Sequence, residues 1–257
     1  MSRHFLVIGA QRCGTTYLHA LLDEHPSIVM ASPASPEPKV FLSDEVVARG
    51  LAWYERTWFD GAADRAGVLL GEKSTSYLED ARSAARARRV LGDAQVVVQL
   101  RDPVERAVSN WQLSSRHGLE TRDVVAALTA DLDGPQSWDP ALTSVSPYAY
   151  VERGRYVEYL PPWQEAFGDR VRIQFLEDLR SRPDGMTQTY RWLGVQGEFS
   201  PPSLGEPVNK SSSRPPRLPS ELMVRLRERF ADSDRALAEM VGRPVPWTTA
   251  AISEGAP

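Results

Sequence analysis

Residues that could bind an anion lie close to the start of the chain. Two glycines separated by four residues, Gly9 and Gly14, follow the apolar residues 5–8 and precede Thr15 and Thr16. The apolar run predicts a buried parallel strand, and the threonines begin a predicted helix. Because such a turn leaves unpaired N–H groups at the N-terminus of a helix, the segment predicts a site for a dense anion such as a phosphate.

The loop departs at one position from the loop that binds nucleoside triphosphates. Thr15 stands where that loop carries a lysine that reaches the β- and γ-phosphates. A triphosphate with its metal ion is therefore a poor fit, whereas Arg12 offers a cation to another dense anion. A tight turn that binds nothing is the alternative interpretation of the same spacing.

A carboxylate and an ammonium group follow within residues 32–42. Three prolines in this segment exclude a helix and favour extended backbone. Since side chains alternate along extended backbone, Glu37 and Lys39 are predicted to point to the same side. They would form either a surface ion pair of little energetic value or a general base beside a cation.

Polar residues also follow a second predicted strand, residues 68–71. Lys73 and its hydroxyl-rich neighbours come directly after this strand. Open α/β sheets bind ligands at the carboxyl ends of their strands, so Lys73 is a candidate for a second cation in the site. The alternative interpretation is a solvated turn.

A third buried strand, residues 96–100, ends at Arg101. Asp102 then caps a predicted helix with Pro103 at its first position, and Glu105 completes a capping box. Because Asp102 occupies the helix tip, an anion bound by Arg101 would lie beside the helix. It would reach a hydroxyl further along, and Ser109 lies about 9 Å along the helix axis.

The loop from Gly9 to Leu18 resembles the 5′-phosphosulfate loop of the sulfotransferases that use 3′-phosphoadenosine-5′-phosphosulfate (PAPS). It is similar above all to the branch of heparan-sulfate-type enzymes and their bacterial relatives. The resemblance implies that the donor contacts six loop residues, which are Gln11, Arg12, Cys13, Gly14, Thr15 and Thr16. The family loop most often has lysine at the position of Arg12, and an arginine neutralises charge there without releasing a proton.

Further segments are similar to family elements in the same chain order. The resemblance implies that Glu37 is the catalytic base, and we group three cations with it as catalytic candidates: Arg12, Lys39 and Lys73. Arg101 and Ser109 match the arginine and the serine that bind the 3′-phosphate. A late polar loop resembles the family loop that folds over the nucleotide, and its candidate residues are Lys210, Ser211, Ser212, Ser213 and Arg214. A flexible linker is the alternative interpretation of that loop.

Composition limits the classes to which the chain can belong. Its 257 residues are 42% hydrophobic and 25% charged, which suits one sizeable α/β domain at residues 1–247 with a frayed tail at 248–257. The net charge of −4 argues against a general nucleic-acid or membrane-surface binder. The sequence has one cysteine, Cys13, which excludes an internal disulfide and a cysteine metal cluster. The short apolar run near the start predicts neither a signal peptide nor a membrane span, so we expect a bacterial cytoplasmic protein.

Hydrophobic periodicity predicts the scaffold. Helices are expected at 44–60, 82–91, 186–193 and 219–241, a further helix begins at Gly154, and residues 170–176 alternate like a strand. Residues 112–150 are less regular apart from a helical start near Val124. We assign acceptor recognition to this stretch, because long surface loops tend to carry specificity.

The sequence therefore predicts an α/β fold, a P-loop-like, doubly wound parallel sheet flanked by helices in a single domain. The predicted activity is in-line transfer of a sulfuryl group from PAPS to a hydroxyl or amine of a small-molecule, natural-product or carbohydrate acceptor. The product would be 3′,5′-adenosine bisphosphate (PAP), and no metal would take part. Two alternatives stay open, a P-loop small-molecule kinase and a non-catalytic nucleotide-binding relative. Neither the acceptor nor the oligomeric state follows from the sequence.

Overall fold

The chain folds into two compact units. The computed structural model describes residues 3–139, 146–181, 184–206 and 216–248. The first unit comprises Met1–Leu100 with Tyr159–Lys210, and the second comprises Arg101–Glu158 with Ser211–Pro257. Apart from Thr248, the predicted C-terminal tail lies outside the described residues.

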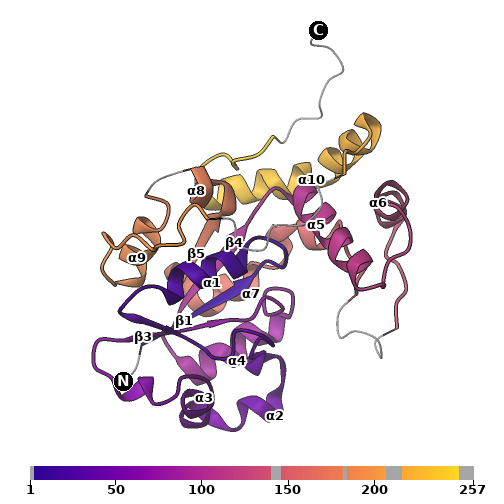
Figure 1. Cartoon of the computed structure of the whole chain (residues 1–257). Coiled ribbons are helices and arrows are strands. Elements are labelled where there is room, and N and C mark those ends of the chain that lie inside the picture. The colour runs from indigo at the N-terminus through magenta and orange to yellow at the C-terminus, as the bar shows by residue number, and fades with distance from the viewer. Residues whose placement is uncertain (1–2, 140–145, 182–183, 207–215, 249–257) are drawn as a thin grey trace. The chain divides into compact units, whose positions relative to one another are not determined.

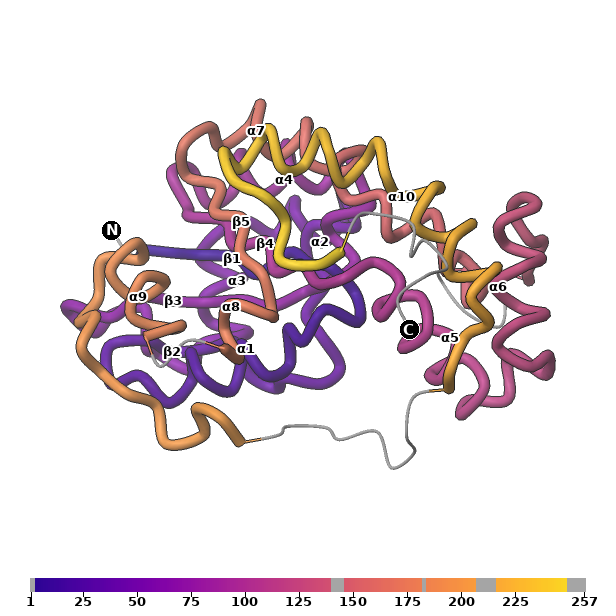
Figure 2. The backbone as a smooth tube through the Cα atoms, turned by 90° about the horizontal axis from the view of Figure 1, so that it is seen from above, coloured from indigo at the N-terminus to yellow at the C-terminus, as the bar shows by residue number. Residues whose placement is uncertain are grey.

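A parallel sheet forms the centre of the first unit. Among the described residues it has five strands in the order β2-β3-β1-β4-β5, which can be followed in Figure 2. The strands are β1 (Arg3–Gly9), β2 (Ile28–Met30), β3 (Leu69–Lys73), β4 (Gln95–Leu100) and β5 (Val171–Phe175). β1 pairs with both β3 and β4, and Val7 lies level with Lys73. Because β1 and β3 run in the same direction, the segments that follow them begin at the same end of the sheet, the carboxyl end of its strands.

Helices cover both faces of this sheet, as a doubly wound fold requires (Figure 1). On one face α1 (Thr15–Asp23), α8 (Leu176–Ser181) and α9 (Thr187–Leu193) pack with Phe5 and Val7 of β1 in one apolar cluster. α3 (Gly50–Trp58) and α4 (Ala81–Leu91) lie on the other face, where α4 also packs against α7 (Pro161–Phe167). Short helical segments complete the unit: η1 (Val40–Leu42), α2 (Asp44–Val47), η2 (Ala62–Asp64) and η5 (Gly168–Arg170). The predicted fold class is confirmed.

The second unit is helical. It contains α5 (Pro103–Arg116), α6 (Val124–Asp133), η3 (Glu152–Gly154), η4 (Tyr156–Glu158) and α10 (Ser220–Val241). Asp102 caps α5 by accepting a hydrogen bond from Val104 N at 2.8 Å. The same carboxylate receives both terminal nitrogens of Arg227 from α10, at 2.9 and 2.5 Å. This buried bidentate ion pair joins the start of α5 to α10.

Two predicted helices differ from the structure. Residues 44–60 form α2 and α3 rather than one helix, because Gly50 adopts a left-handed φ of 77° at their junction. Leu51, in the first turn of α3, is exposed. The helix predicted to begin at Gly154 consists of the 3₁₀ segments η3 and η4, and α7 begins only at Pro161, a residue suited to the first helical position.

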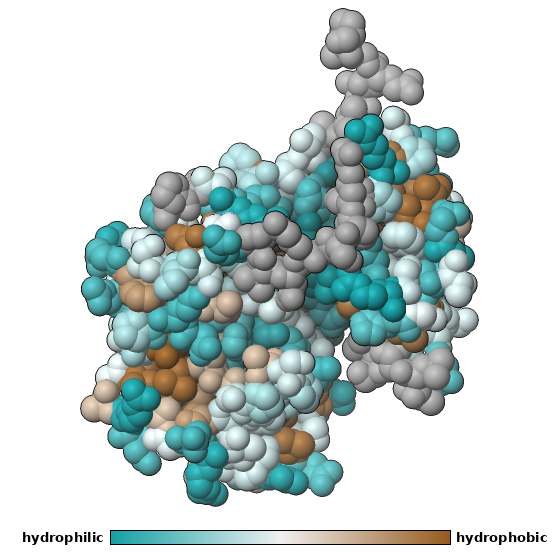
Figure 3. Space-filling view, in the orientation of Figure 1, coloured by the Kyte–Doolittle hydropathy of each residue, from teal (hydrophilic) through white to brown (hydrophobic). Residues whose placement is uncertain are grey.

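On the face of the first unit that Figure 3 shows, small apolar patches alternate with polar residues. Among the described residues Leu51 is the one large apolar side chain classed as exposed, at 36%. None of the helices in the described part of the chain combines the length and the apolar character needed to cross a membrane.

We predict that Asp234→Asn stabilises the protein above pH 6. Asp234 of α10 is buried, accepts from Trp247 Nε1 at 2.9 Å, and its other oxygen has no hydrogen-bond partner among the described residues. Burial raises the pKa of Asp234 from 3.8 to about 6. The folded chain thus keeps a proton that the unfolded chain loses, and the free energy of unfolding falls as pH rises through this interval.

Asparagine still accepts from Trp247 but does not titrate. The difference in unfolding free energy between the variant and the wild type should therefore grow in the variant's favour by about 2 kcal/mol between about pH 4.5 and about pH 7.5. Urea unfolding at both pH values measures it. Asp232→Asn, at an exposed position of the same helix, is the control. A difference that does not change with pH would contradict the assignment.

Candidate functional site

The loop between β1 and α1 requires glycine at one point. Gly14 has a left-handed φ of 76° immediately before α1. A methyl group on it would lie 2.7 Å from Leu176 Cδ1 and 3.2 Å from Gln99 Nε2. Arg12 also has a left-handed φ, of 69°. Such conformations turn successive backbone N–H groups towards one side, which is the geometry of an anion-binding concavity.

A ladder of buried amides holds this loop in place. Gln99 of β4 donates from Nε2 to Cys13 O at 2.9 Å, and its backbone oxygen accepts from Ala10 N at 2.8 Å. Gln174 of β5 donates to Gln99 Oε1 at 3.0 Å, and Thr189 of α9 donates to Gln174 Oε1 at 2.8 Å. Since Gln99 is fully buried, water does not compete for these bonds and the loop has one preferred conformation.

The first turn of α1 is open to an anion. Its N-cap is Gly14, so no side chain caps the helix, and no acidic residue occurs in the first turn. Thr15 is buried and Thr16 is exposed. The positive end of the helix dipole and the hydroxyl of Thr16 are therefore available to a negatively charged group.

Three groups donate hydrogen bonds to the carboxylate of Glu37. Lys73 Nζ lies 2.7 Å from Oε1, Thr75 N lies 2.9 Å from Oε2, and Thr75 Oγ1 lies 3.2 and 3.1 Å from the two oxygens. The side chains of Lys73 and Glu37 are 8% and 17% exposed, so water competes little with their contact. Ser74 N donates to Val7 O at 3.1 Å, which ties this cluster to the strand that leads into the anion loop.

The predicted partner of Glu37 was wrong. Lys39 adopts a left-handed φ of 53° and its side chain is exposed, so the backbone of this segment is not extended and the two-residue period fails. Glu37 contacts Lys73 of β3 instead, 36 residues away. Long-range pairing of this kind cannot be read from local periodicity. The catalytic role of Lys39 stays a prediction.

His19 is a nearby titratable residue that the sequence analysis missed. It lies on α1, one turn after Thr15, and is half-buried. Burial lowers the pKa of His19, and the charge of Lys73 acts in the same direction, whereas Asp23 and Glu37 oppose it. The structure thus adds an imidazole, biased towards its neutral form, to the groups around the ion pair. Its spacing of four residues from Thr15 was the available signal, since such residues share a helix face.

Arg101 and Ser109 belong to the second unit. Arg101 forms an ion pair with Glu105, and its backbone oxygen accepts from Tyr156 Oη at 2.9 Å. Asp102 caps α5 as predicted, and Glu105, which was predicted to complete a capping box, forms the ion pair with Arg101. Ser109 lies on α5 and is half-buried.

The late loop lies outside the described residues. It comprises the predicted residues Lys210, Ser211, Ser212, Ser213 and Arg214. Their role stays a prediction.

The segment assigned to the acceptor contains the helix predicted near Val124, which is α6 (Val124–Asp133) and is confirmed. In the same stretch Arg122 Nη2 lies 2.7 Å from Glu120 Oε2, and Tyr150 Oη donates to that oxygen at 3.0 Å. These contacts organise the segment. Its role in acceptor recognition stays a prediction.

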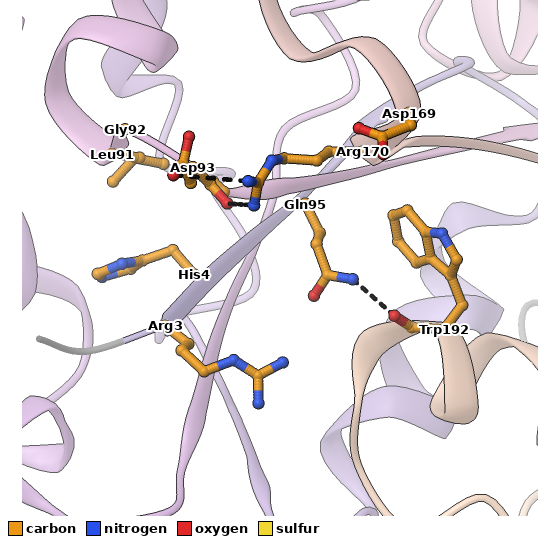
Figure 4. Close-up of a pocket in the computed structure, with 10 residues that line it drawn as sticks. Arg3, His4, Leu91, Gly92, Asp93, Gln95, Asp169, Arg170 and Trp192 are labelled. Carbon is orange, nitrogen blue, oxygen red and sulfur yellow. Dashed lines mark hydrogen bonds and ion pairs between the residues drawn. The ribbon is translucent and has the colours of Figure 1, made fainter.

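A pocket of about 860 Å³ lies at the opposite end of the sheet, the amino end of its strands, where β1 and β4 begin and η5 precedes β5 (Figure 4). Arg170 Nη1 donates to Asp93 O at 3.0 Å, and Gln95 Nε2 donates to Trp192 O at 2.6 Å. These polar groups thus bond within the wall of the pocket. Because open α/β sheets bind ligands at the carboxyl ends of their strands, we assign the candidate site to the loop and Glu37 instead.

Metal ligands do not cluster in the described ranges. No group of three or more His, Cys, Asp or Glu side chains there is arranged to hold a metal ion. The donors around Glu37 are an ammonium, an amide and a hydroxyl, which are partners for an anion rather than for a cation. The metal-free mechanism stays a prediction.

Known proteins match this chain at the level of family and fold. A family model described as "Sulfotransferase domain" matches residues 2–210. A bifunctional heparan sulfate N-deacetylase/N-sulfotransferase 1 of Caenorhabditis briggsae is 29% identical over 198 residues, which cover 74% of this chain. The chain spans only 22% of that relative's length.

Two further proteins match almost the whole chain. A heparan sulfate glucosamine 3-O-sulfotransferase 6 of Homo sapiens is 26% identical over 270 residues, covering 94% of this chain and 72% of the human protein. A crystal structure of a sulfotransferase from Alicyclobacillus acidocaldarius superposes with a TM-score of 0.75 at 24% identity, over 95% of this chain and 98% of the other. This structural likeness supports the fold.

We predict that Gly14→Ala abolishes PAP binding. Alanine in a left-handed conformation costs roughly 1–2 kcal/mol, and here its methyl group must also displace Leu176 and Gln99. Gly242→Ala is a matched control, because Gly242 has φ 68° and ψ 20°, close to the 76° and 20° of Gly14, and its added methyl would meet no atom within 4 Å in the described part of the chain. Urea unfolding should show a larger loss for Gly14→Ala, and calorimetry should show PAP binding only for the control. Equal PAP affinity in both variants would contradict the role of the loop.

Proposed function

Because the chain belongs to the sulfotransferase domain family, we propose that it transfers a sulfuryl group from PAPS to a hydroxyl or amine of a carbohydrate or natural-product acceptor. The observation that carries the proposal is the buried contact of Glu37 with Lys73 and Thr75. This contact lies beside the strand that leads into an anion-binding loop. A base and cations next to a phosphate site are what sulfuryl transfer requires of a protein.

The residues present fit the 5′ side of the donor. The loop from Gln11 to Thr16 offers backbone N–H groups, an uncapped helix N-terminus and the guanidinium of Arg12. PAPS, when bound, supplies the sulfuryl group on a 5′-phosphate, which then leaves as PAP. Each charge-assisted hydrogen bond to those oxygens would contribute on the order of 1.5–3 kcal/mol. Arg12 would neutralise the leaving phosphate without giving up a proton.

Glu37 would accept the proton of the acceptor. Its oxygens are oriented by Lys73 and by the amide and hydroxyl of Thr75, so the carboxylate has one fixed direction. A carboxylate offers about four acceptor positions, so it can receive the acceptor's hydrogen in addition to these bonds. Lys73 has three N–H groups, and those not directed at Glu37 can stabilise the transferring oxygens. His19 and Lys39 are further groups that could contact the acceptor.

The 3′-phosphate is assigned to Arg101 and Ser109, with Lys210, Ser211, Ser212, Ser213 and Arg214 covering the nucleotide. Family resemblance and the residue types support this assignment. Arginine binds phosphate with two parallel hydrogen bonds, and its partner Glu105 is 59% exposed and therefore easily exchanged for a ligand. Residues 112–150 are assigned to the acceptor, and relatives named for heparan sulfate favour a carbohydrate.

Calorimetry tests the donor. PAP should bind without a metal ion, and ATP with Mg²⁺ should bind at least tenfold more weakly. Tighter binding of ATP with Mg²⁺ would favour the kinase alternative. Incubation with radiolabelled PAPS and panels of glycans and hydroxylated natural products then tests transfer. Tight PAP binding with no transfer to any acceptor would leave the non-catalytic relative.

We predict that Glu37→Gln lowers kcat by about 10²–10⁴-fold and leaves PAP affinity within a factor of two. The amide keeps the size and one acceptor oxygen but cannot take a proton. Glu45→Gln, at an exposed position close by in the chain, should leave kcat unchanged. Steady-state kinetics with PAP calorimetry separate the two effects, and near-normal turnover of Glu37→Gln would remove this residue as the base.

We also predict that Arg101→Ala weakens PAP binding by about 10–100-fold, which corresponds to one charge-assisted phosphate contact. The affinity for adenosine 5′-phosphate, which lacks the 3′-phosphate, should change much less. Arg116→Ala, at the exposed end of α5, should affect neither ligand. An equal loss for both ligands in Arg101→Ala would exclude a specific 3′ role.

A further inference from the structure

Glu72 is a buried carboxylate that the proposed mechanism does not use. It precedes Lys73 in β3, and adjacent residues of a strand point to opposite faces of the sheet. Its side chain is fully buried on the face opposite to that of Lys73. A buried carboxylate without hydrogen-bond partners would destabilise the folded protein, so the partners of Glu72 explain how it is accommodated there.

Three hydroxyl groups donate to Glu72. Ser74 Oγ and Tyr77 Oη donate to Oε1 at 2.7 and 2.6 Å, and Tyr54 Oη of α3 donates to Oε2 at 2.8 Å. Burial raises the pKa of Glu72, while these three hydrogen bonds act in the opposite direction. The hydrogens of the three hydroxyls point to the oxygens of Glu72, each of which can accept more than one hydrogen bond.

Two of these hydroxyls also accept hydrogen bonds from the segment that carries Glu37. Lys39 N donates to Ser74 Oγ at 2.9 Å, and Phe41 N donates to Tyr77 Oη at 3.2 Å. A hydroxyl has one hydrogen, and since that hydrogen points to Glu72, its lone pairs face the amides. Two chains of hydrogen bonds thus run from the backbone of residues 39 and 41 to one buried carboxylate.

The segment from Glu72 to Tyr77 has two tasks. Lys73 and Thr75 hold the carboxylate of Glu37, whereas Ser74 and Tyr77 hold the backbone that follows it. The left-handed φ of 53° at Lys39, unfavourable for a residue with a side chain, lies within this fastened stretch. The bond at Lys39 N lies directly at this residue, and Leu42 N also donates to Lys39 O at 3.2 Å.

We propose that Glu72, acting through the hydroxyls of Ser74 and Tyr77, is a positioning residue that sets the geometry of the general base Glu37. This inference rests on the proposed role of Glu37. Glu72 touches neither donor nor acceptor. It aligns the segment from Glu37 to Phe41, and a misplacement of a reacting group by about 1 Å costs on the order of a hundredfold in rate.

The test compares three single substitutions that each remove one hydroxyl from Glu72. Tyr77→Phe and Ser74→Ala also remove an acceptor of a backbone amide, whereas Tyr54→Phe removes a hydroxyl whose one hydrogen bond among the described residues is to Glu72. Tyr54→Phe is the matched control for the loss of stability. Thermal unfolding verifies that each variant is folded at the assay temperature.

Two measurements are expected to separate the variants. In hydrogen exchange followed by NMR, the Phe41 amide should exchange at least tenfold faster in Tyr77→Phe than in the wild type. The Lys39 amide should exchange at least tenfold faster in Ser74→Ala. Neither amide should change its exchange rate in Tyr54→Phe. Steady-state kinetics should show kcat about 10–100-fold lower in the first two variants, KM for PAPS within a factor of two, and Tyr54→Phe close to the wild type.

Each outcome decides the proposal. Losses of kcat no larger in Tyr77→Phe and Ser74→Ala than in Tyr54→Phe would overturn it, and so would unchanged exchange of both amides. If Tyr77→Phe does not fold, Ser74→Ala against Tyr54→Phe decides alone. A failure of the proposed base is distinguished by Glu37→Gln: normal turnover in that variant removes the base, whereas the exchange result still reports whether Glu72 fastens the segment.

Discussion

Parallel pairing of β1 with β3 is the constraint on which the candidate site depends. With Val7 level with Lys73, both strands end at the same edge of the sheet. The candidate anion loop follows β1, and the partners of Glu37, Lys73 and Thr75, lie at the end of β3, so that pairing brings the loop and this carboxylate to the same end of the sheet. In an antiparallel pair the residues after β3 would emerge at the opposite edge, and neither group could serve the other.

Buried polar contacts then determine the local geometry. Gln99 orders the anion loop through Cys13, and Glu72 orders the segment after Glu37 through two hydroxyls. Both are fully buried, where a hydrogen bond meets no competition from water and a missing partner is expensive. Preorganisation of this kind suits sulfuryl transfer, because the protein contributes position and charge rather than a covalent intermediate. The surface ion pairs of the same unit, such as Arg88 with Asp93, carry no comparable role.

The parts that sequence predicted well are those in which short-range signals agree. Gly14, the threonines after it and the apolar run before it all indicate a strand, a turn and a helix, and the structure has each of them. The predictions that were wrong each ignored a competing interaction. Lys73 rather than Lys39 contacts Glu37, and Gly50 breaks the helix predicted over residues 44–60.

The sequence by itself determined the fold class and the anion loop, because strand and helix periods and the glycine positions are local properties of the chain. It also identified Glu37 and Lys73 as candidates, although as members of separate segments. Only the tertiary structure decided that these two residues contact each other, that His19 lies near them, and that Glu72 is tied to the backbone beside Glu37. These contacts join residues that are far apart in the sequence, such as Glu37 and Lys73, which are 36 positions apart. Strand pairing brings such residues together, and no local pattern in the sequence encodes that pairing.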